Sequence, residues 1–234
     1  MNYQGGKFRI AKQIVGAIER ERERESNRKN FVSLFCGACS IETLIDIPNK
    51  ICNDKHPYLI AMWEALQDGW IPPEVVTKED YEYIRNHKDE NPALTGFVGF
   101  GCSFGGKWFG GYAKNKRGDN YARAAQRGLL KQANSLSNIT FTCLDYKEVI
   151  IPNNSIVLAD PPYAQTTGYS LGEFDNDEFW DYMRELSQNN QVFICEQTAP
   201  NDFEVIWQQE LKRCLDANKD NNFTITEKLF KYKK

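Results

Sequence analysis

The four residues Asp160, Pro161, Pro162 and Tyr163 constrain this chain most. They follow the apolar run 155–159 (SIVLA), a pattern typical of a buried β-strand. Because proline has no N–H group, two consecutive prolines cannot continue a hydrogen-bonded strand. The acid is therefore expected to end a strand, with the aromatic ring just beyond it on a stiff turn. Open α/β sheets bind ligands outside the carboxyl ends of their strands, so these groups are expected to face a ligand.

A fixed carboxylate, a free carbonyl and a flat ring suit an amino group on a planar heterocycle. The Asp160 carboxylate and the Pro161 carbonyl would accept the two N–H bonds of such an amine, and the Tyr163 ring would stack on the heterocycle. A strand-ending turn with a packed surface tyrosine explains the tetrapeptide equally well by itself. The remaining motifs of the chain must decide between these interpretations.

With 234 residues, the chain is long enough for one good-sized domain, or for one domain with an insertion. No apolar run approaches the roughly 18 residues of a membrane span, and the first residues show no apolar signal region. We therefore expect a cytoplasmic protein with reduced thiols. Cys36 and Cys39 form a lone C-x-x-C, and the two histidines, His56 and His87, supply no partners at metal spacing. No metal is expected.

Apolar strand-like runs alternate with helical patterns along the chain. Strands are expected at 31–35, 50–53, 139–143, 155–159 and 192–196, with closing strands at 203–211 and 223–232. Helices are expected from Gly6 to about 26, near 41–45, and at 58–67, 78–88 and 120–134, the last one capped by Asp119. This alternation predicts an α/β protein with a mostly parallel sheet and helices on both faces.

The segment 70–135 interrupts that rhythm, and we interpret it as an inserted lobe in a domain made of 1–69 and 136–234. Within it, 96–118 is rich in glycine and aromatic residues, which argues against a regular element. Residues 107–131 carry seven lysines and arginines against one acid, although the whole chain has a net charge of −3. Basic residues bind phosphates and aromatic rings stack on bases, so a polyanion partner is preferred over a structural loop.

Two further motifs follow the first two predicted strands. The segment 35–40 (FCGACS) makes a tight turn of small residues, where a ligand can approach the backbone and free N–H groups. It is neither a G-x-G-x-x-G motif nor a phosphate-binding loop with Lys-Ser/Thr. Asp54 ends the next strand, where an acid either accepts hydrogen bonds from ribose hydroxyls or caps the following helix.

Two motifs remain open from the residues alone. Asp145-Tyr146 follows the strand 139–143, so the acid is expected either to accept a hydrogen bond from a bound adenine or to form a turn. The N-terminal run 3–7 (YQGGK) is either a helix cap or a segment that closes over a ligand, with Lys7 balancing a carboxylate.

Taken in order, these motifs resemble the adenine-specific DNA methyltransferases of the Dam-type group. The runs 3–7, 31–42, 145–146 and 160–163, together with Asp54, match the family's ordered motifs across nearly the whole chain. One feature departs from the family's motifs, and another indicates which members the chain is most similar to. Ala38 and Cys39 stand where a second glycine is common, and the insertion's 104–111 (FGGKWFGG) is most similar to phage-like members.

The resemblance implies a Rossmann-like, S-adenosylmethionine-dependent methyltransferase fold with a seven-stranded, mostly parallel sheet and an inserted target-recognition lobe. The implied catalytic residues are Asp160, Pro161, Pro162 and Tyr163. The implied cofactor-binding residues are Tyr3, Gly5, Gly6, Lys7, Phe35, Cys36, Gly37, Ala38, Asp54, Asp145, Tyr146 and Asp160. Candidate DNA contacts are Lys107, Trp108, Lys114, Asn115, Lys116, Arg117, Arg123 and Arg127.

The implied activity is methyl transfer from S-adenosylmethionine to N6 of adenine in double-stranded DNA, with base flipping and no metal. A bacterial or phage-infected cell is the implied setting, where a cognate restriction endonuclease is a potential functional partner. Two alternatives stay open: an amine or amide methyltransferase acting on RNA or protein, and a catalytically silent DNA-binding module. The glycine spacing disfavours a dinucleotide oxidoreductase.

Overall fold

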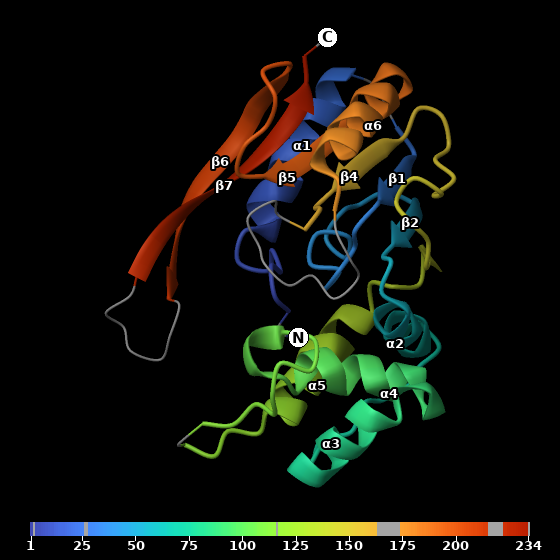
Figure 1. Cartoon of the computed structure of the whole chain (residues 1–234). Coiled ribbons are helices and arrows are strands. Elements are labelled where there is room, and N and C mark those ends of the chain that lie inside the picture. Colours follow the sequence, from blue (N-terminus) through green and yellow to red (C-terminus); the bar gives the residue numbers. More distant parts are fainter. Residues whose placement is uncertain (2, 26–27, 116, 163–173, 215–221, 234) are drawn as a thin grey trace.

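The strands of the chain join into one sheet (Figure 1). The computed structural model describes residues 1, 3–25, 28–115, 117–162, 174–214 and 222–233. Seven strands lie in the order β3-β2-β1-β4-β5-β7-β6. Their bounds are Asn30–Ser33 (β1), Asn49–Asn53 (β2), Ile139–Thr142 (β3), Ile156–Ala159 (β4), Gln191–Glu196 (β5), Phe203–Cys214 (β6) and Asn222–Tyr232 (β7). The first five are parallel, and β7 runs antiparallel to both β5 and β6. The predicted mostly parallel sheet is confirmed.

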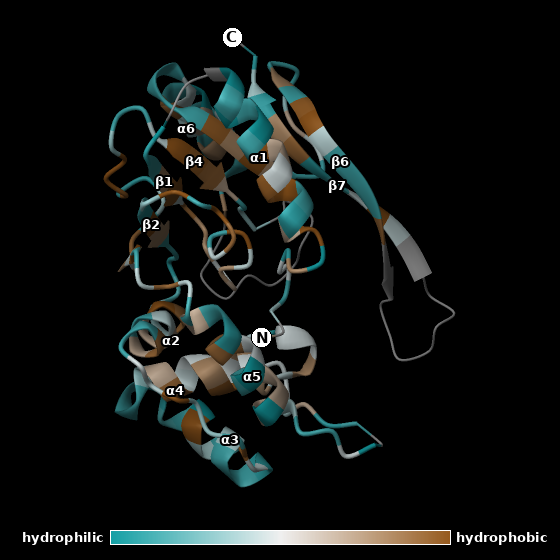
Figure 2. Cartoon of the chain, turned by 180° about the vertical axis from the view of Figure 1, so that it is seen from behind, coloured by the Kyte–Doolittle hydropathy of each residue, from teal (hydrophilic) through white to brown (hydrophobic). Residues whose placement is uncertain are grey.

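Alternating apolar residues give the sheet two buried faces. Phe31, Ile156 and Phe193 pack on the face covered by α1 (Ala11–Glu25). Their chain neighbours, such as Val157, pack on the opposite face, where α6 (Asn176–Asn189) lies. Figure 2 shows the apolar strands in the centre and the more polar helices outside. The period of two along each strand therefore builds the core on both sides. Sequence reasoning did not predict α6.

The segment after the glycine turn differs from the prediction of a helix at 41–45. It forms a single turn, closed by a 3.2 Å hydrogen bond from the Ile45 N–H to the Ile41 carbonyl. Ile41, Ile45 and Ile47 are all buried on the α1 face, and Pro48 follows at once. Ile41 and Ile45 have helical spacing, but Ile45 and Ile47 are two residues apart and both buried, a pattern of extended chain that a helix cannot present to one surface. Burial of Ile47 and the proline that follows it therefore prevail over helix propagation.

The segment 70–135 forms a helical lobe below the sheet in Figure 1. It contains α3 (Lys78–Asn86), α4 (Pro92–Gly96), the π-helical turn Phe97–Gly101 and α5 (Tyr121–Ala133), with 3₁₀ turns at Lys88–Glu90 and Phe104–Gly106. The run 96–101 is therefore helical, contrary to the expected irregular structure. Gly96 permits this, because a Cβ there would collide with the Tyr58 carbonyl oxygen of α2 (Pro57–Gln67). The glycine therefore allows α4 and α2 to approach each other closely.

The predicted cap of α5 is also corrected. The Asn120 side chain, one residue later than expected, accepts a 2.9 Å hydrogen bond from the Arg123 N–H. Asp119 instead accepts from the Asn115 side-chain amide at 2.6 Å. Asn and Asp are both good N-cap residues, so the position of each in the turn determines which one caps α5.

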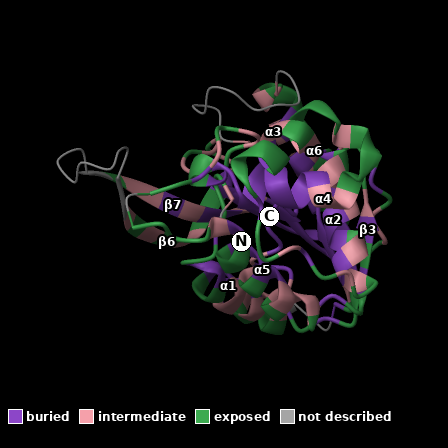
Figure 3. Ribbon diagram, turned by 90° about the horizontal axis from the view of Figure 1, so that it is seen from below, coloured by how far each residue is buried: buried purple, intermediate pink, exposed green. Residues whose placement is uncertain are grey.

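Helix α2 joins the lobe to the sheet through one apolar cluster. Trp63 of α2 is fully buried in the cluster that also holds Tyr81 and Phe97 of the lobe and Phe141 of β3. Figure 3 shows buried residues running through α2 and α4. The division into two domains at residues 70 and 135 stays a prediction. None of the helices in the described part of the chain has the length and apolar character needed to cross a bilayer.

Candidate functional site

A cavity of about 320 Å³ lies at the carboxyl ends of β1, β2 and β4, facing the lobe. It collects residues that the sequence placed in separate motifs: Tyr3, Gly5, Gly6, Lys7, Phe35, Cys36, Gly37, Ala38, Asp54, Asp160, Pro161 and Pro162. The wall is completed by Gln4, Ser40, Ile41, Glu42, His56, Phe100, Gly106, Lys107, Trp108 and Gly110. Most of this second group lie inside motifs without having been named as cavity residues, and Lys107 and Trp108 were predicted as DNA contacts. His56 and Phe100 had no individual sequence signal, because they reach the cavity only after folding.

Asp160 follows the last residue of β4, as its sequence context predicted. The Lys7 ammonium donates a 2.7 Å hydrogen bond to Asp160 Oδ1 and lies 3.9 Å from the Glu227 carboxylate of β7. Burial is the largest single effect and lowers the pKa of Lys7, but the negative groups around it, Asp160 first, together outweigh burial and the pKa is raised. A charged Lys7 therefore holds the Asp160 carboxylate in place. Tyr163 lies outside the described residues.

The glycine turn and Asp54 are tied together by backbone hydrogen bonds. The Gly37 N–H donates to Asp54 Oδ2, and the His56 N–H donates to Oδ1, both at 3.0 Å. Gly37 has a φ of +45°, and a Cβ there would lie 3.0 Å from the Tyr3 ring, so glycine suits this position. Burial raises the pKa of Asp54 to about 6, against the effect of the two amides. Asp54 caps no helix, and its carboxylate lines the cavity.

His56 is a cavity residue that sequence reasoning missed. Its ring lies among aromatic side chains, with centroids 4.2 Å from Trp108 and 4.9 Å from Phe100. Burial lowers the pKa of His56 to about 4, so the imidazole is neutral at pH 7. Its Nδ1 is buried without a hydrogen-bond partner. An orphaned polar atom in a cavity wall is explained by a polar ligand.

The lobe closes the cavity with its glycine-rich loop. The Gln4 N–H donates to the Gly106 carbonyl at 3.2 Å, which ties the N-terminal motif to that loop. Trp108 stacks on Tyr58 at 5.4 Å with an interplanar angle of 15°, and Gly99 leaves the space that its ring fills. Trp108 therefore packs within the protein as part of the cavity wall.

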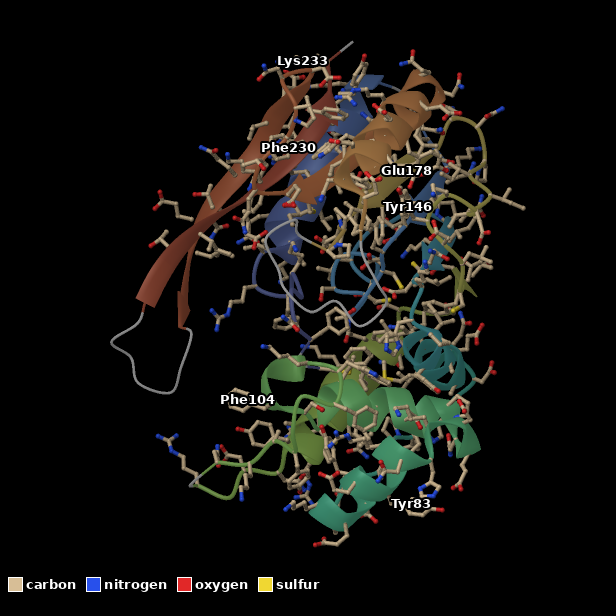
Figure 4. All side chains as sticks on the ribbon, in the orientation of Figure 1. Tyr83, Phe104, Tyr146, Glu178, Phe230 and Lys233 are labelled. Atoms are coloured by element: carbon tan, nitrogen blue, oxygen red, sulfur yellow. The ribbon has the colours of Figure 1, made fainter. Side chains whose placement is uncertain are left out.

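The structure places Asp145 and Tyr146 away from this cavity. Asp145 forms a 2.9 Å ion pair with Lys55, and this hydrogen bond lowers its pKa against the opposing effect of burial. Tyr146 packs against Phe35 at 5.3 Å and against Phe179 of α6 (Figure 4). Neither residue lines the cavity, but Phe35, which contacts Tyr146, does.

The candidate DNA contacts on the lobe have several roles. Lys107 lines the cavity, whereas Lys114, Arg117, Arg123 and Arg127 are exposed, and Lys116 lies outside the described residues. Asn115 holds the turn, because its side-chain oxygen accepts from the N–H groups of Arg117 at 3.1 Å and Asp119 at 3.2 Å. Arg123 forms a 3.0 Å ion pair with Glu74.

The ordered assembly of these motifs in one cavity agrees with a comparison of the sequence with protein-family models. Residues 3–97 match the model of the D12 class N6 adenine-specific DNA methyltransferases. That range includes the N-terminal motif, the glycine turn, Asp54 and His56. No curated protein matches the chain.

Two solved structures are similar to the chain at low sequence identity. A candidate RNA methyltransferase from Pyrococcus horikoshii shares 11% identity, with 95% of this chain and 81% of that chain covered and a TM-score of 0.44. A candidate methyltransferase solved with S-adenosylhomocysteine shares 12% identity, with 94% of this chain and 52% of that chain covered and a TM-score of 0.32.

S-adenosylmethionine is the cofactor that the resemblance to adenine-specific DNA methyltransferases implies, and the residues of the cavity fit it. The backbone at Gly37 leaves room beside the Tyr3 ring, Asp54 offers a carboxylate for ribose hydroxyls, and the His56 ring offers a nitrogen without a partner. When bound, this cofactor supplies a methyl group that is already activated for transfer.

Proposed function

We propose that the protein methylates N6 of adenine in DNA. The observation that carries this proposal is the position of Asp160 and Pro161 in the same cavity as Gly37 and Asp54. A group that accepts hydrogen bonds from an amine thus lies beside a nucleoside-binding turn. The match to the D12 class over residues 3–97 supports the same reaction.

The exocyclic nitrogen of adenine is a weak nucleophile, because its lone pair is delocalised into the ring. The Asp160 carboxylate and the Pro161 carbonyl would accept its two N–H bonds and favour a pyramidal nitrogen. If that nitrogen took the methyl group that a bound cofactor would supply, positive charge would grow on it. The two acceptors therefore stabilise the transition state more than the ground state. The nitrogen then loses one proton, and Asp160 is placed to accept it.

Lys7 keeps Asp160 ready for this role. Its ammonium bonds Oδ1 at 2.7 Å, so the carboxylate is held in a fixed position in the cavity wall. A preorganised acceptor needs no reorganisation during the reaction. The target base must leave the duplex to reach this depth, and Tyr163, from the resemblance, is the residue expected to stack on it.

The lobe supports DNA as the substrate. Lys107 lines the same cavity as Pro161 and Pro162, and the lobe carries further basic residues that are exposed. Such residues bind phosphates and position the duplex without specifying sequence. A silent DNA-binding module would have no need for a complete amine-accepting group inside a cofactor cavity.

The test is transfer of labelled methyl from S-adenosylmethionine to mixed-sequence duplex DNA, followed by nucleoside analysis. We expect labelled N6-methyladenine, and a loss of roughly a hundredfold or more in Asp160→Ala, since such an acceptor contributes ~3 kcal/mol. Asp145→Ala is the matched control, because that acid lies outside the cavity, and it should retain activity. Label on RNA or protein instead of DNA would refute the substrate.

A further inference from the structure

Glu42 is a buried carboxylate in the cavity wall that the mechanism above does not use. Its side chain is 3% exposed and lies five residues after Gly37. The Ser33 hydroxyl donates to Oε1 at 2.7 Å, and the Ile41 N–H donates to Oε2 at 3.0 Å. Lys50 bonds the main-chain carbonyl of Glu42 and not its carboxylate. Among the described residues, Glu42 thus has two neutral donors and no ion pair.

The Glu42 carboxylate has no directly bonded cation in the described part of the chain, although its charge opposes the lowering of the pKa of Lys50 by burial. Asp160 and Glu227 both lie within ion-pair distance of the Lys7 ammonium, and Lys7 and Glu227 are at most 5% exposed. Burial raises the pKa of Glu42 to about 7, and the Asp160 charge adds to this, against hydrogen bonds from the main chain of Glu42 itself, from Ser33 and from Ile41. A buried carboxylate without a directly bonded cation is costly. Its position in a cavity wall indicates that a bonding cation arrives with a ligand.

Two groups of the cofactor carry positive charge, the sulfonium and the α-ammonium of the methionine moiety. Each oxygen of Glu42 accepts one hydrogen bond in the structure and retains capacity for another. An ammonium has three N–H donors, whereas a sulfonium has none. The hydrogen bonds from Ser33 and Ile41 fix the orientation of the Glu42 carboxylate. A carboxylate held in this way accepts hydrogen bonds, which suits the ammonium and not the sulfonium.

We propose that Glu42 binds the α-ammonium group of the cofactor's methionine moiety. This assignment rests on the methyltransferase function proposed above. It makes Glu42 a residue that selects ligands carrying a free amine on the amino-acid chain attached to sulfur. Ser33 is then a positioning residue, because its hydroxyl orients the Glu42 carboxylate.

The test is calorimetric titration of the whole protein and of Glu42→Gln with three ligands. S-adenosylmethionine carries both charges, S-adenosylhomocysteine carries the ammonium without the sulfonium, and 5′-methylthioadenosine carries neither. We expect the Gln variant to lose about ten- to a hundredfold in affinity for the first two ligands, since hydrogen bonds to charged groups are that strong. Its affinity for 5′-methylthioadenosine should stay within about twofold.

Each other result overturns the assignment. Loss for S-adenosylmethionine alone would place the sulfonium at Glu42, and equal loss for all three ligands would indicate a structural role. Glu64→Gln on the exposed face of α2 controls for the change in net charge. If Glu42→Gln does not fold, Ser33→Ala should show the same ligand pattern with a smaller loss. Absence of binding by the unaltered protein would refute the proposed function itself.

Discussion

Replacing Glu42 by glutamine should stabilise the ligand-free protein at neutral and alkaline pH. Burial moves the pKa of this carboxyl from an ordinary 4.5 to about 7. At about 1.36 kcal/mol per pH unit, keeping it ionised above pH 7 costs the folded protein about 3 kcal/mol. A glutamine amide keeps both hydrogen bonds, if its oxygen accepts from the Ile41 N–H and its NH₂ donates to the Ser33 hydroxyl. It carries no charge to desolvate.

The sign of the pH dependence follows from the raised pKa. Between pH 4.5 and pH 7 the folded protein binds more protons at Glu42 than the unfolded chain does, so its free energy of unfolding falls as pH rises. The Gln variant lacks this dependence. Its advantage should be absent below about pH 4.5, should grow through that window, and should be constant above about pH 7.

The assay is urea unfolding of both proteins, without ligand, at pH 5 and pH 8. We expect the variant to be more stable by roughly 1–3 kcal/mol at pH 8, which corresponds to several degrees in Tm for a chain of this size. The slopes of the unfolding curves should be unchanged. A variant that is less stable at pH 8, or a difference that is equal at both pH values, would refute the electrostatic reasoning.

Three further changes test other parts of the structure. Lys7→Met removes the cation from the buried Glu227 carboxylate and the half-buried Asp160 carboxylate and should lower the free energy of unfolding by about 3 kcal/mol in urea titrations at pH 7, with part of the loss recovered at pH 5. Gly96→Ala forces a Cβ onto the Tyr58 carbonyl and should cost about 2 kcal/mol or more in the same assay; unchanged stability would contradict the close helix contact. Arg127→Ala should weaken duplex binding and reduce the salt slope by about 1, whereas Arg123→Ala, whose guanidinium is paired with Glu74, should have a smaller effect in fluorescence anisotropy titrations.

The sheet could be predicted from the sequence because each strand carries its own signal. Runs such as 156–159 are apolar on both faces and end at residues that cannot continue a strand, so their limits were predicted to within about two residues. The carboxyl ends of parallel strands meet at one edge. For this reason the sequence alone could place in one cavity three residues that are far apart in the chain, Gly37, Asp54 and Asp160.

The rest of the cavity depended on contacts that leave no local pattern. Glu42 belongs to a segment that resembled a helix, and its inward side chain follows from the burial of three isoleucines around it. His56 reaches the wall because α2 begins at the next residue, and Phe100 because a π-helical turn aims it there. Asp145 had the right strand position, but Lys55 pairs with its carboxylate outside the cavity.

The ion pair between Lys7 and Asp160 also bears on how the protein is made. These residues are 153 positions apart, and a ribosome adds roughly 5–20 residues per second, so on the order of ten seconds separates the synthesis of the two partners. Throughout that interval Lys7 has no Asp160 to meet, and the central strand β1 has no β4 beside it. The cavity thus cannot be complete until β4 and Asp160 have been synthesised, and truncated products that end before β4 should be unable to retain the proposed cofactor.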